Sequence, residues 1–157
     1  MPSRGKQYEN CVKENWRRTF PRGFLYRIRD QVSGLKGSTN ISDFIGYVSG
    51  ILFLIECKSH QGNIFPLVNL TQYNNLLAYQ GIPGIRMGVF LWMIDHGVEV
   101  YIPISTITAM KKDGIKSFNI KMLQKQDYRI FVFPSKRKRV FLESDYSLLI
   151  NSLQEGD

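Results

Sequence analysis

Residues 43–58 read DFIGYVSGILFLIECK, and this stretch decides the predicted fold. Asp43 opens a first predicted strand, because Phe44, Ile45, Tyr47 and Val48 are residue types that favour strands. Ser49-Gly50 is a turn signal between two apolar runs. Residues 51–58 then form a second predicted strand, apolar for most of its length and charged at its end. The stretch therefore predicts a β-hairpin.

The second strand of this hairpin ends in an acid and a base. Side chains alternate between the two faces of a strand, so each face has its own set of residues. One face carries Leu52, Leu54, Glu56 and Lys58, and the other carries Ile51, Phe53, Ile55 and Cys57. Charged groups beside an apolar run are costly unless they are paired or bound to a metal. Glu56 and Lys58 therefore need a structural or functional reason.

A functional reason comes from Asp43, which the hairpin can bring alongside Glu56. Two carboxylates that converge beside Lys58 can hold a hard divalent cation and an attacking water molecule. The alternative is a structural ion pair, because charged residues at strand ends are common and the spacing is degenerate. The three residues alone leave both interpretations open.

Length and charge limit the class of protein. The chain has 157 residues and 43% hydrophobic residues, which predicts one soluble domain spanning residues 1–157. A net charge of +8 suggests a polyanionic partner, either nucleic acid or an anionic membrane. No apolar run approaches the roughly 18 residues that span a bilayer, and the N-terminus lacks the apolar stretch of a signal peptide. Cys11 and Cys57 indicate an intracellular protein with free thiols.

The N-terminal part of the chain predicts a helix followed by a strand. Residues 1–6 form a short basic tail, and a helix over residues 7–18 carries an apolar stripe of Tyr8, Cys11, Val12 and Trp16. Pro21-Arg22-Gly23 ends this helix. A strand over residues 24–29 is followed by a mobile loop over residues 30–41.

Helices and strands alternate in the remainder of the chain. The predicted helices are residues 69–79, a short helix capped by Ser105 and ending at Lys112, and a final helix capped by Ser144. The predicted strands are residues 86–94, 98–102 and 128–133, with a turn at 95–97. Residues 59–66 are expected to be a loop, and residues 111–126 a polar, basic segment with weaker structure. This order predicts an α/β fold with a central mixed sheet flanked by helices.

Other candidate motifs are less specific. Residues 136–139, KRKR, are either a solvated surface run or a set of phosphate contacts. His60 and His96 lack the spacing of metal ligands. The large aromatic residues Trp16, Tyr73 and Trp92 are assigned to the core rather than to base stacking. Neither a phosphate-binding glycine loop nor a nucleophilic triad is indicated.

Asp43, the hairpin and Glu56-Cys57-Lys58 together resemble the PD-(D/E)XK nuclease motif. More narrowly, the order of several short motifs resembles the RecU family of Holliday junction resolvases of bacteria or phages. These motifs are Arg4-Gly5 with Glu9, Ser42-Asp43-Phe44 with Gly46-Tyr47 and Gly50, Phe65-Pro66-Leu67 with Asn69, Gln72 with Leu76, and Asp145-Tyr146 before an apolar tail.

The resemblance implies a restriction-endonuclease-like fold and a cytoplasmic homodimer that cuts four-way DNA junctions in recombination and repair. It also implies Mg²⁺ as cofactor, with Mn²⁺ as a substitute. Asp43 and Glu56 would hold the metal. Lys58 would orient or help to deprotonate the attacking water and steady the phosphate. Glu9 would be an auxiliary acid, and Gln72 a positioning residue.

The predicted DNA contacts are basic residues from both ends of the chain. They are Arg4, Lys6, Arg27, Arg29, Lys36, Lys136, Arg137, Lys138 and Arg139. Glu9 is by default a solvated charge, and it joins the site only if its helix packs beside the Asp43–Glu56 end of the sheet.

The chain departs from the family pattern at three places. Ser42 replaces the usual proline before the aspartate. Residues 30–42 are short for the basic stalk that enters a junction, and the spacing from Phe65 to Gln72 is shorter. Two alternatives therefore stay open: a nuclease of this class that acts on other branched or duplex DNA, and a non-catalytic DNA-binding protein on the same fold.

Overall fold

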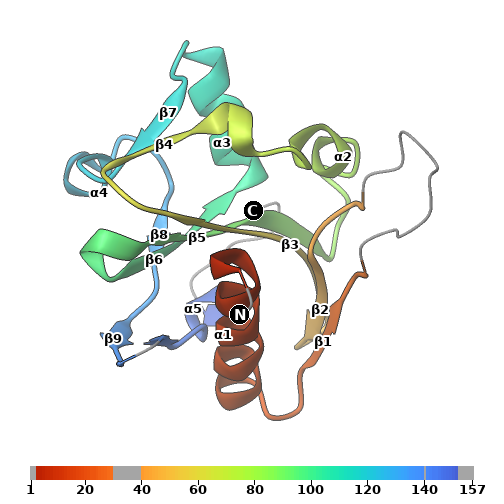
Figure 1. Ribbon diagram of the computed structural model, residues 1–157. Helices are drawn as coiled ribbons and strands as arrows, with labels where there is room; N and C mark the ends of the chain where they lie inside the picture. The colour runs from red at the N-terminus through yellow and green to blue at the C-terminus, as the bar shows by residue number, and fades with distance from the viewer. Residues whose placement is uncertain (1–2, 30–39, 140, 152–157) are drawn as a thin grey trace, which may run out of the picture.

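The computed structural model describes residues 3–29, 40–139 and 141–151, which form a six-stranded central sheet with helices on both faces (Figure 1). The strands lie in the order β1 (Phe24–Arg27), β2 (Phe44–Val48), β3 (Ile51–His60), β5 (Ile85–Met93), β6 (Val98–Pro103) and β8 (Phe131–Val132). The β3–β5 pair is parallel and the other pairs are antiparallel. The predicted α/β fold with a central mixed sheet is therefore confirmed.

The predicted hairpin is present as β2 and β3. Its turn residues Ser49 and Gly50 have φ angles of 54° and 78°, and positive values at both positions are what a type I′ hairpin turn requires. The register pairs Phe44 with Ile55 and Val48 with Ile51. This register places Asp43, one residue before β2, beside the segment of β3 that contains Glu56.

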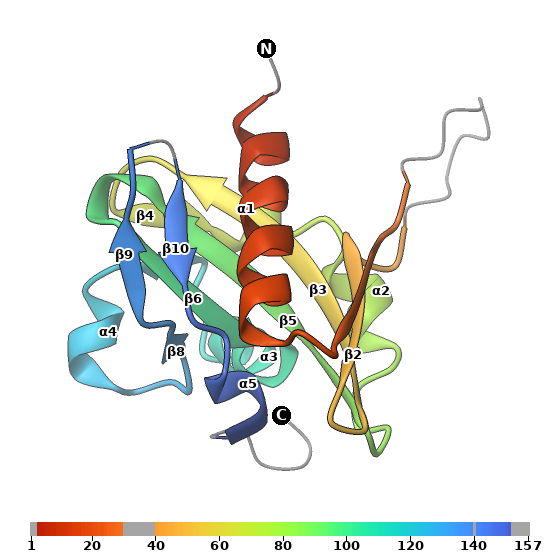
Figure 2. The same cartoon turned by 90° about the horizontal axis from the view of Figure 1, so that it is seen from below.

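The first face of the sheet is covered by α1 (Arg4–Thr19) and α5 (Leu148–Asn151), with the two-stranded ribbon of β9 (Ser135–Arg137) and β10 (Leu142–Ser144) beside them (Figure 2). The predicted stripe of Tyr8, Cys11, Val12 and Trp16 is buried there, as expected. The Trp16 ring lies so close to β2 that a Cβ atom on Gly46 would be 2.8 Å from it. Gly46 therefore lets α1 sit directly on the hairpin.

The second face packs against α2 (Tyr73–Leu77) and α3 (Ile104–Lys112). The remaining elements are β4 (Ile64–Pro66) paired with β7 (Ser117–Asn119), α4 (Met122–Lys125), and the 3₁₀ turns η1 (Leu67–Asn69) and η2 (Ile94–His96). The side chains of β3 alternate between the two faces of the sheet, as predicted. Phe53, Ile55 and Cys57 pack in the core under α1, whereas Leu54 packs in the core under α2 and α3.

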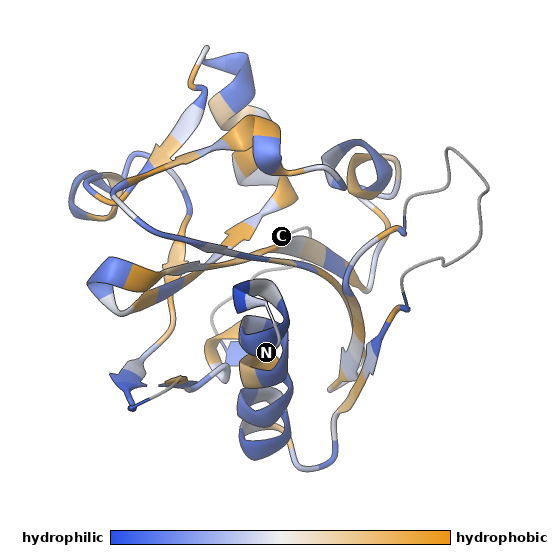
Figure 3. Ribbon diagram, in the orientation of Figure 1, coloured by the Kyte–Doolittle hydropathy of each residue, from blue (hydrophilic) through white to orange (hydrophobic). Residues whose placement is uncertain are grey.

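The hydropathy of the residues follows the arrangement of the sheet and its covering helices. Figure 3 shows hydrophobic colour along the central strands and mainly hydrophilic colour on α1, of which only one stripe meets the sheet. No helix among the described residues is both long and apolar enough to span a membrane.

Several predicted boundaries are wrong. Helix α1 begins at Arg4 because the Ser3 hydroxyl accepts a hydrogen bond from the Lys6 N–H, so residues 4–6 belong to a helix and not to a tail. The first strand ends at Arg27. The third strand continues to His60, and β4 occupies residues 64–66, so only the middle of the predicted 59–66 loop is a loop.

Of the predicted helix over residues 69–79, only the five-residue α2 is α-helical, and Asn69 ends the 3₁₀ turn η1. The helix does not start at residue 69 because Leu70 has a non-helical backbone conformation. The predicted strand over 128–133 is limited to residues 131–132. The segment 111–126 contains β7 and α4.

Two predicted helix caps are also wrong. Helix α3 begins at Ile104, so Ser105 lies within it and Pro103 holds the cap position. Ser144 belongs to β10 and bonds to the Ser135 hydroxyl across the ribbon. Asp145 instead accepts a hydrogen bond from the Ser147 N–H just before α5. Most of the predicted mobile loop, residues 30–39, lies outside the described residues.

Candidate active site

Asp43 is fixed at the entrance to β2 by four hydrogen bonds. Its backbone N–H donates to the Ile55 carbonyl at 3.0 Å, and its carbonyl accepts from the Ile28 N–H at 2.9 Å. Its Oδ2 atom accepts from the Cys57 N–H at 2.7 Å, and its Oδ1 atom accepts from the Gln72 side-chain amide at 3.4 Å. The carboxylate is therefore held against β3 next to Glu56, as the hairpin predicted.

Glu56 is fully buried in β3, at 0% exposure. The Lys58 ammonium lies 3.7 Å from its Oε1 atom, and the Lys58 side chain remains 32% exposed. Within the described part of the chain, neither carboxylate oxygen of Glu56 has a hydrogen-bond partner. A buried carboxylate in this state is expensive unless a cation completes its surroundings.

Burial raises the pKa of both carboxyl groups. The pKa of Glu56 rises to about 7, because desolvation and the Asp43 charge outweigh the stabilising effect of Lys58. The pKa of Asp43 is also raised, by desolvation first and by the Glu9 charge to a lesser degree, while the Cys57 N–H, Arg27 and Gln72 act in the opposite direction. Without a bound metal ion, burial therefore disfavours the ionised form of both carboxyl groups.

Glu9 reaches this site from α1. The Arg27 guanidinium donates to its two carboxylate oxygens at 2.7 Å and 3.1 Å, in a half-buried, bidentate ion pair. Helix α1 packs on β3, so the condition that the sequence set for Glu9 is met. The sequence did not indicate that Arg27 on β1 would be the partner of Glu9.

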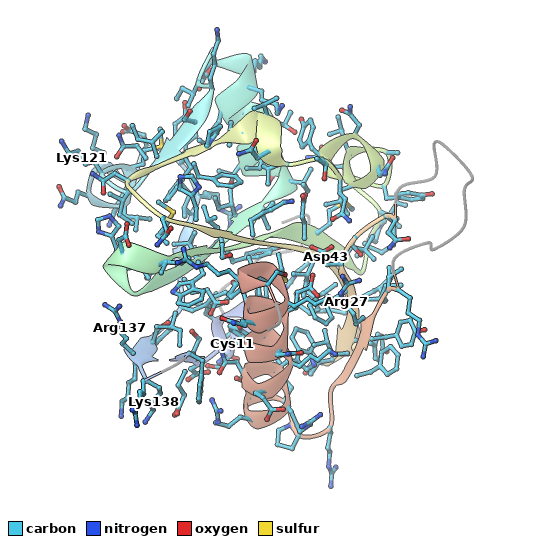
Figure 4. All side chains as sticks on the ribbon, in the orientation of Figure 1. Cys11, Arg27, Asp43, Lys121, Arg137 and Lys138 are labelled. Atoms are coloured by element: carbon cyan, nitrogen blue, oxygen red, sulfur yellow. The ribbon has the colours of Figure 1, made fainter. Side chains whose placement is uncertain are left out.

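A cavity of about 630 Å³ opens beside these groups. The site residues that line it are Glu9, Arg27, Asp43 and Lys58, together with Arg4 and Lys6 from the first turn of α1. Figure 4 shows Asp43 and Arg27 close to one end of α1. The cavity combines carboxylates with four basic side chains, a mixture that suits a cation and a phosphate together.

Gln72 lies at the residue before α2, and its side-chain amide reaches Asp43. Gln72 therefore lies beside Asp43, and its role as a positioning residue stays a prediction. The sequence pattern placed Gln72 inside a helix, whereas the structure places it at the residue before α2.

The predicted DNA contacts fall into separate groups. Arg4, Lys6 and Arg27 line the cavity, and Arg29 lies just beyond them at the end of β1. The exposed run of residues 136–139 begins in β9, on the other side of α1 from Asp43, where Figure 4 labels Arg137 and Lys138. Lys138 pairs with Glu143 at 3.5 Å. Lys36 lies outside the described residues.

The donor set for a metal is small. No cluster of three or more His, Cys, Asp or Glu side chains suited to a metal occurs within residues 3–29, 40–139 and 141–151. Asp43 and Glu56 nevertheless offer oxygens of the type that Mg²⁺ prefers, and both Glu56 oxygens, which have no hydrogen-bond partner among the described residues, can coordinate a cation. His96 contacts Asn63, and His60 packs edge-on against Phe65.

One contributor to the site could not be read from residue types. The Cys57 backbone N–H holds Asp43, and only the hairpin register could have indicated it. The large aromatic residues behave as predicted, since Trp16 and Tyr73 are buried and Trp92 packs against the α1 core.

Neither a scan against models of protein families nor a search of curated proteins finds a match for this chain. A search of solved structures finds Hjc, a Holliday junction resolvase from the archaeal hyperthermophile Archaeoglobus fulgidus, with a TM-score of 0.45 and 15% identity. The similarity covers 64% of this chain and 77% of that chain.

Proposed function

We propose that the protein is a metal-dependent endonuclease of the PD-(D/E)XK class that cuts branched DNA, resembling the Holliday junction resolvases. One observation carries the proposal. Asp43 is held by the Cys57 N–H beside Glu56, whose buried carboxylate has Lys58 nearby and no hydrogen-bond partner in the described chain. In a purely structural ion pair the carboxylate oxygens would also accept hydrogen bonds, whereas here Lys58 stands 3.7 Å away and both Glu56 oxygens can still coordinate a cation.

Asp43 and Glu56 would hold Mg²⁺, or Mn²⁺ in its place. When bound, such an ion lowers the pKa of a coordinated water and screens charge on the phosphate. Lys58, whose ammonium lies 3.7 Å from Glu56, would orient the attacking water and contact the phosphate. Gln72 would keep the Asp43 carboxylate in position. Glu9, held by Arg27, would serve as an auxiliary acid at the wall of the cavity.

The DNA would be bound chiefly through its phosphates. Arg4 and Lys6 lie on the cavity wall, and the basic run of residues 136–139 would extend the contact beyond α1. A homodimer would place two such sites by two-fold symmetry, which suits paired nicks on opposite strands of a junction. A bacterial or phage origin and a cytoplasmic location belong to the same proposal.

A second candidate is a nuclease of this class that acts on other branched DNA or on plain duplex. It is favoured by the short connection between β1 and β2, which leaves few residues for a junction-entering stalk. A third candidate, a non-catalytic DNA-binding protein, is disfavoured because Asp43, Glu56 and Lys58 are all present in one place.

The test is a cleavage assay on labelled four-way junctions, flaps and linear duplexes, with Mg²⁺, Mn²⁺ or EDTA. We expect metal-dependent cutting that is fastest on the four-way junction and leaves a 5′-phosphate. Lys58→Ala should abolish cutting and keep junction binding. Equal rates on duplex and junction would reject the resolvase assignment, and unchanged cutting by Lys58→Ala would reject the site.

A further inference from the structure

The two-stranded ribbon of β9 and β10 is strongly basic. Residues 135–144, SKRKRVFLES, contain four basic residues and one acidic residue, Glu143. All four basic residues are exposed, and only Lys138 has an acidic partner within the described part of the chain, namely Glu143 at 3.5 Å. The ribbon therefore presents a net positive field, which attracts a polyanion.

The register of the ribbon decides which of its side chains face outward. Arg137 pairs with Leu142, whose side chain is buried in the core under α1, so this pair belongs to the inner face. The next pair along the ribbon is Lys138 and Phe141, because the Lys138 N–H donates to the Phe141 carbonyl at 2.8 Å. Side chains alternate between the two faces, so Lys138 and Phe141 lie on the outer face. Phe141 is accordingly 41% exposed.

Contacts with α1 show where this end of the ribbon lies. The Tyr146 N–H donates to the hydroxyl of Thr19, the last residue of α1, at 3.2 Å. Four residues earlier, the Leu142 carbonyl accepts from the Asn15 amide at 3.0 Å and from the Cys11 thiol at 2.8 Å. From Tyr146 back to Leu142, the chain therefore moves from the last residue of α1 toward its first turn. Figure 2 shows β9 ending, and β10 beginning, toward the N-terminal end of α1.

The same end of the ribbon adjoins the catalytic cavity. A Cβ atom on Gly97 would lie 3.9 Å from the Cδ atom of Arg137, so the ribbon is a neighbour of the residue that follows η2. Ile94, the first residue of η2, lines the catalytic cavity, as do Arg4 and Lys6 from the first turn of α1. DNA that occupies the cavity and continues past the N-terminus of α1 would therefore reach the outer face of the ribbon.

The shape of the ribbon favours duplex DNA as its partner. A two-stranded β-ribbon is one of the elements that the major groove of B-DNA admits. There, basic side chains contact the phosphates, and a phenyl ring can pack against the C5-methyl group of thymine. An anionic membrane also attracts positive charge, but the single exposed phenyl ring of Phe141 offers it little apolar area to bury.

We propose that the β9–β10 ribbon enters the major groove of a duplex arm that extends from the catalytic cavity. Lys138 and Arg139 contact the phosphates of that arm, and Phe141 packs against a thymine methyl group. This inference rests on the proposed action on branched DNA and deepens it. It assigns the arm beside the cut to a defined element and gives the protein a preference for thymine in that arm.

The test measures binding in EDTA, so that it does not depend on cleavage. Fluorescence anisotropy compares a labelled duplex that contains thymine with the same duplex in which deoxyuridine replaces every thymidine, because uracil lacks only the C5-methyl group. We expect the unmodified protein to bind the thymine duplex about fourfold more tightly, the factor for one buried methyl group. Phe141→Ser should bind both duplexes equally, whereas Phe141→Leu, which keeps an apolar side chain, should retain a preference for thymine.

The double variant Lys138→Gln/Arg139→Gln tests the phosphate contacts. It should make the salt dependence of duplex binding shallower, by about 0.9 in log–log slope for each phosphate that is no longer neutralised. As controls, Lys112→Gln/Lys125→Gln makes the same change of charge in α3 and α4, and Tyr79→Ser removes an exposed aromatic ring after α2. These control proteins should bind both duplexes as the unmodified protein does.

Photocrosslinking gives a direct readout of the groove. In a duplex that contains 5-iododeoxyuridine, the iodine atom takes the place of the thymine methyl group in the major groove. It should crosslink to Phe141, as located by mass spectrometry. Equal binding of the two duplexes by the unmodified protein, or crosslinks confined to residues outside the ribbon, would overturn the ribbon assignment even if junction cleavage is observed.

Two further outcomes separate the ribbon from its alternatives. Co-sedimentation with vesicles of phosphatidylcholine and phosphatidylglycerol tests a membrane partner. If Phe141→Ser lowers vesicle binding and leaves duplex binding unchanged, the ribbon is a membrane contact and the proposal fails. Duplex binding that depends on both Phe141 and the thymine methyl group, without any metal-dependent cleavage, would support the ribbon assignment and reject the nuclease function.

Discussion

The backbone N–H of Cys57 donates a 2.7 Å hydrogen bond to the Oδ2 atom of Asp43. This bond joins the residue that opens β2 to the strand that carries Glu56 and Lys58. It fixes one carboxylate beside the other and still leaves the two Glu56 oxygens without a partner among the described residues. The hairpin thus assembles the candidate metal site from the two ends of the stretch 43–58.

Replacing Asp43 by asparagine should lower the cleavage rate without changing the fold. The side-chain oxygen of asparagine can still accept the Cys57 N–H, so circular dichroism should show an unchanged fold. The lost charge should lower the cleavage rate on a four-way junction by about 100-fold or more, the scale expected for one essential electrostatic group. Asp127→Asn, an exposed change of the same kind, should cut normally. Full activity of Asp43→Asn would remove Asp43 from the mechanism.

Glu56 should make the metal-free protein less stable as the pH rises. Its pKa is about 7 in the folded protein against an ordinary value of 4.5, so the folded state keeps a proton that the unfolded state releases. The contribution to stability is complete below about pH 4.5 and is lost on the way to pH 7, on the order of 3 kcal/mol in total.

Urea unfolding in EDTA at several pH values measures this effect. Asp43 and Glu99 also have raised pKa values and add slopes of the same sign, so the comparison has to be made with Glu56→Gln. Relative to that variant, the unmodified protein should lose stability between about pH 4.5 and pH 7. Parallel stability curves for the two proteins would contradict the assigned shift.

The Glu9–Arg27 ion pair should couple α1 to β1. Arg27→Met leaves a half-buried carboxylate without its bidentate partner and should lower the free energy of unfolding by about 2 kcal/mol. Adding Glu9→Gln should recover part of that loss, because the unpaired charge is then gone. A double-mutant cycle of unfolding free energies, each measured by urea unfolding, gives the coupling energy between Glu9 and Arg27. Strictly additive effects would show that the pair contributes nothing to holding α1 in place.

A buried network around Glu99 should stabilise the face opposite α2 and α3. Glu99 is inaccessible to solvent, and it accepts hydrogen bonds from the hydroxyl groups of Tyr8 and Tyr146, the second at 2.9 Å. Tyr146→Phe removes one donor and should cost about 1–3 kcal/mol. Tyr79→Phe, at an exposed position, should cost nothing measurable. Thermal unfolding compares the two, and equal melting temperatures would exclude a stabilising role for the Tyr146 hydroxyl.

Local sequence patterns predicted the β2–β3 hairpin and the buried faces of β3 and α1. Strand-forming residues on either side of Ser49-Gly50, and the alternation of β3, depend on interactions between near neighbours that the sequence displays directly. The stripe from Tyr8 to Trp16 likewise gave the buried face of α1. The cap at Ser105 was wrong because α3 already begins at Ile104, and the cap at Ser144 was wrong because that residue pairs with Ser135 in the β9–β10 ribbon. Local propensity does not register such alternatives.

The sequence by itself determined the α/β class, the β2–β3 hairpin and the placement of Asp43 next to Glu56, because all three follow from periodicity and short-range register. Only the tertiary structure decided that Arg27 neutralises Glu9, that Gln72 reaches Asp43 and that the first turn of α1 lines the cavity with Arg4 and Lys6. These relationships join segments that are distant in the chain. They depend on how α1, β1 and α2 pack on the sheet, and no local pattern encodes that packing.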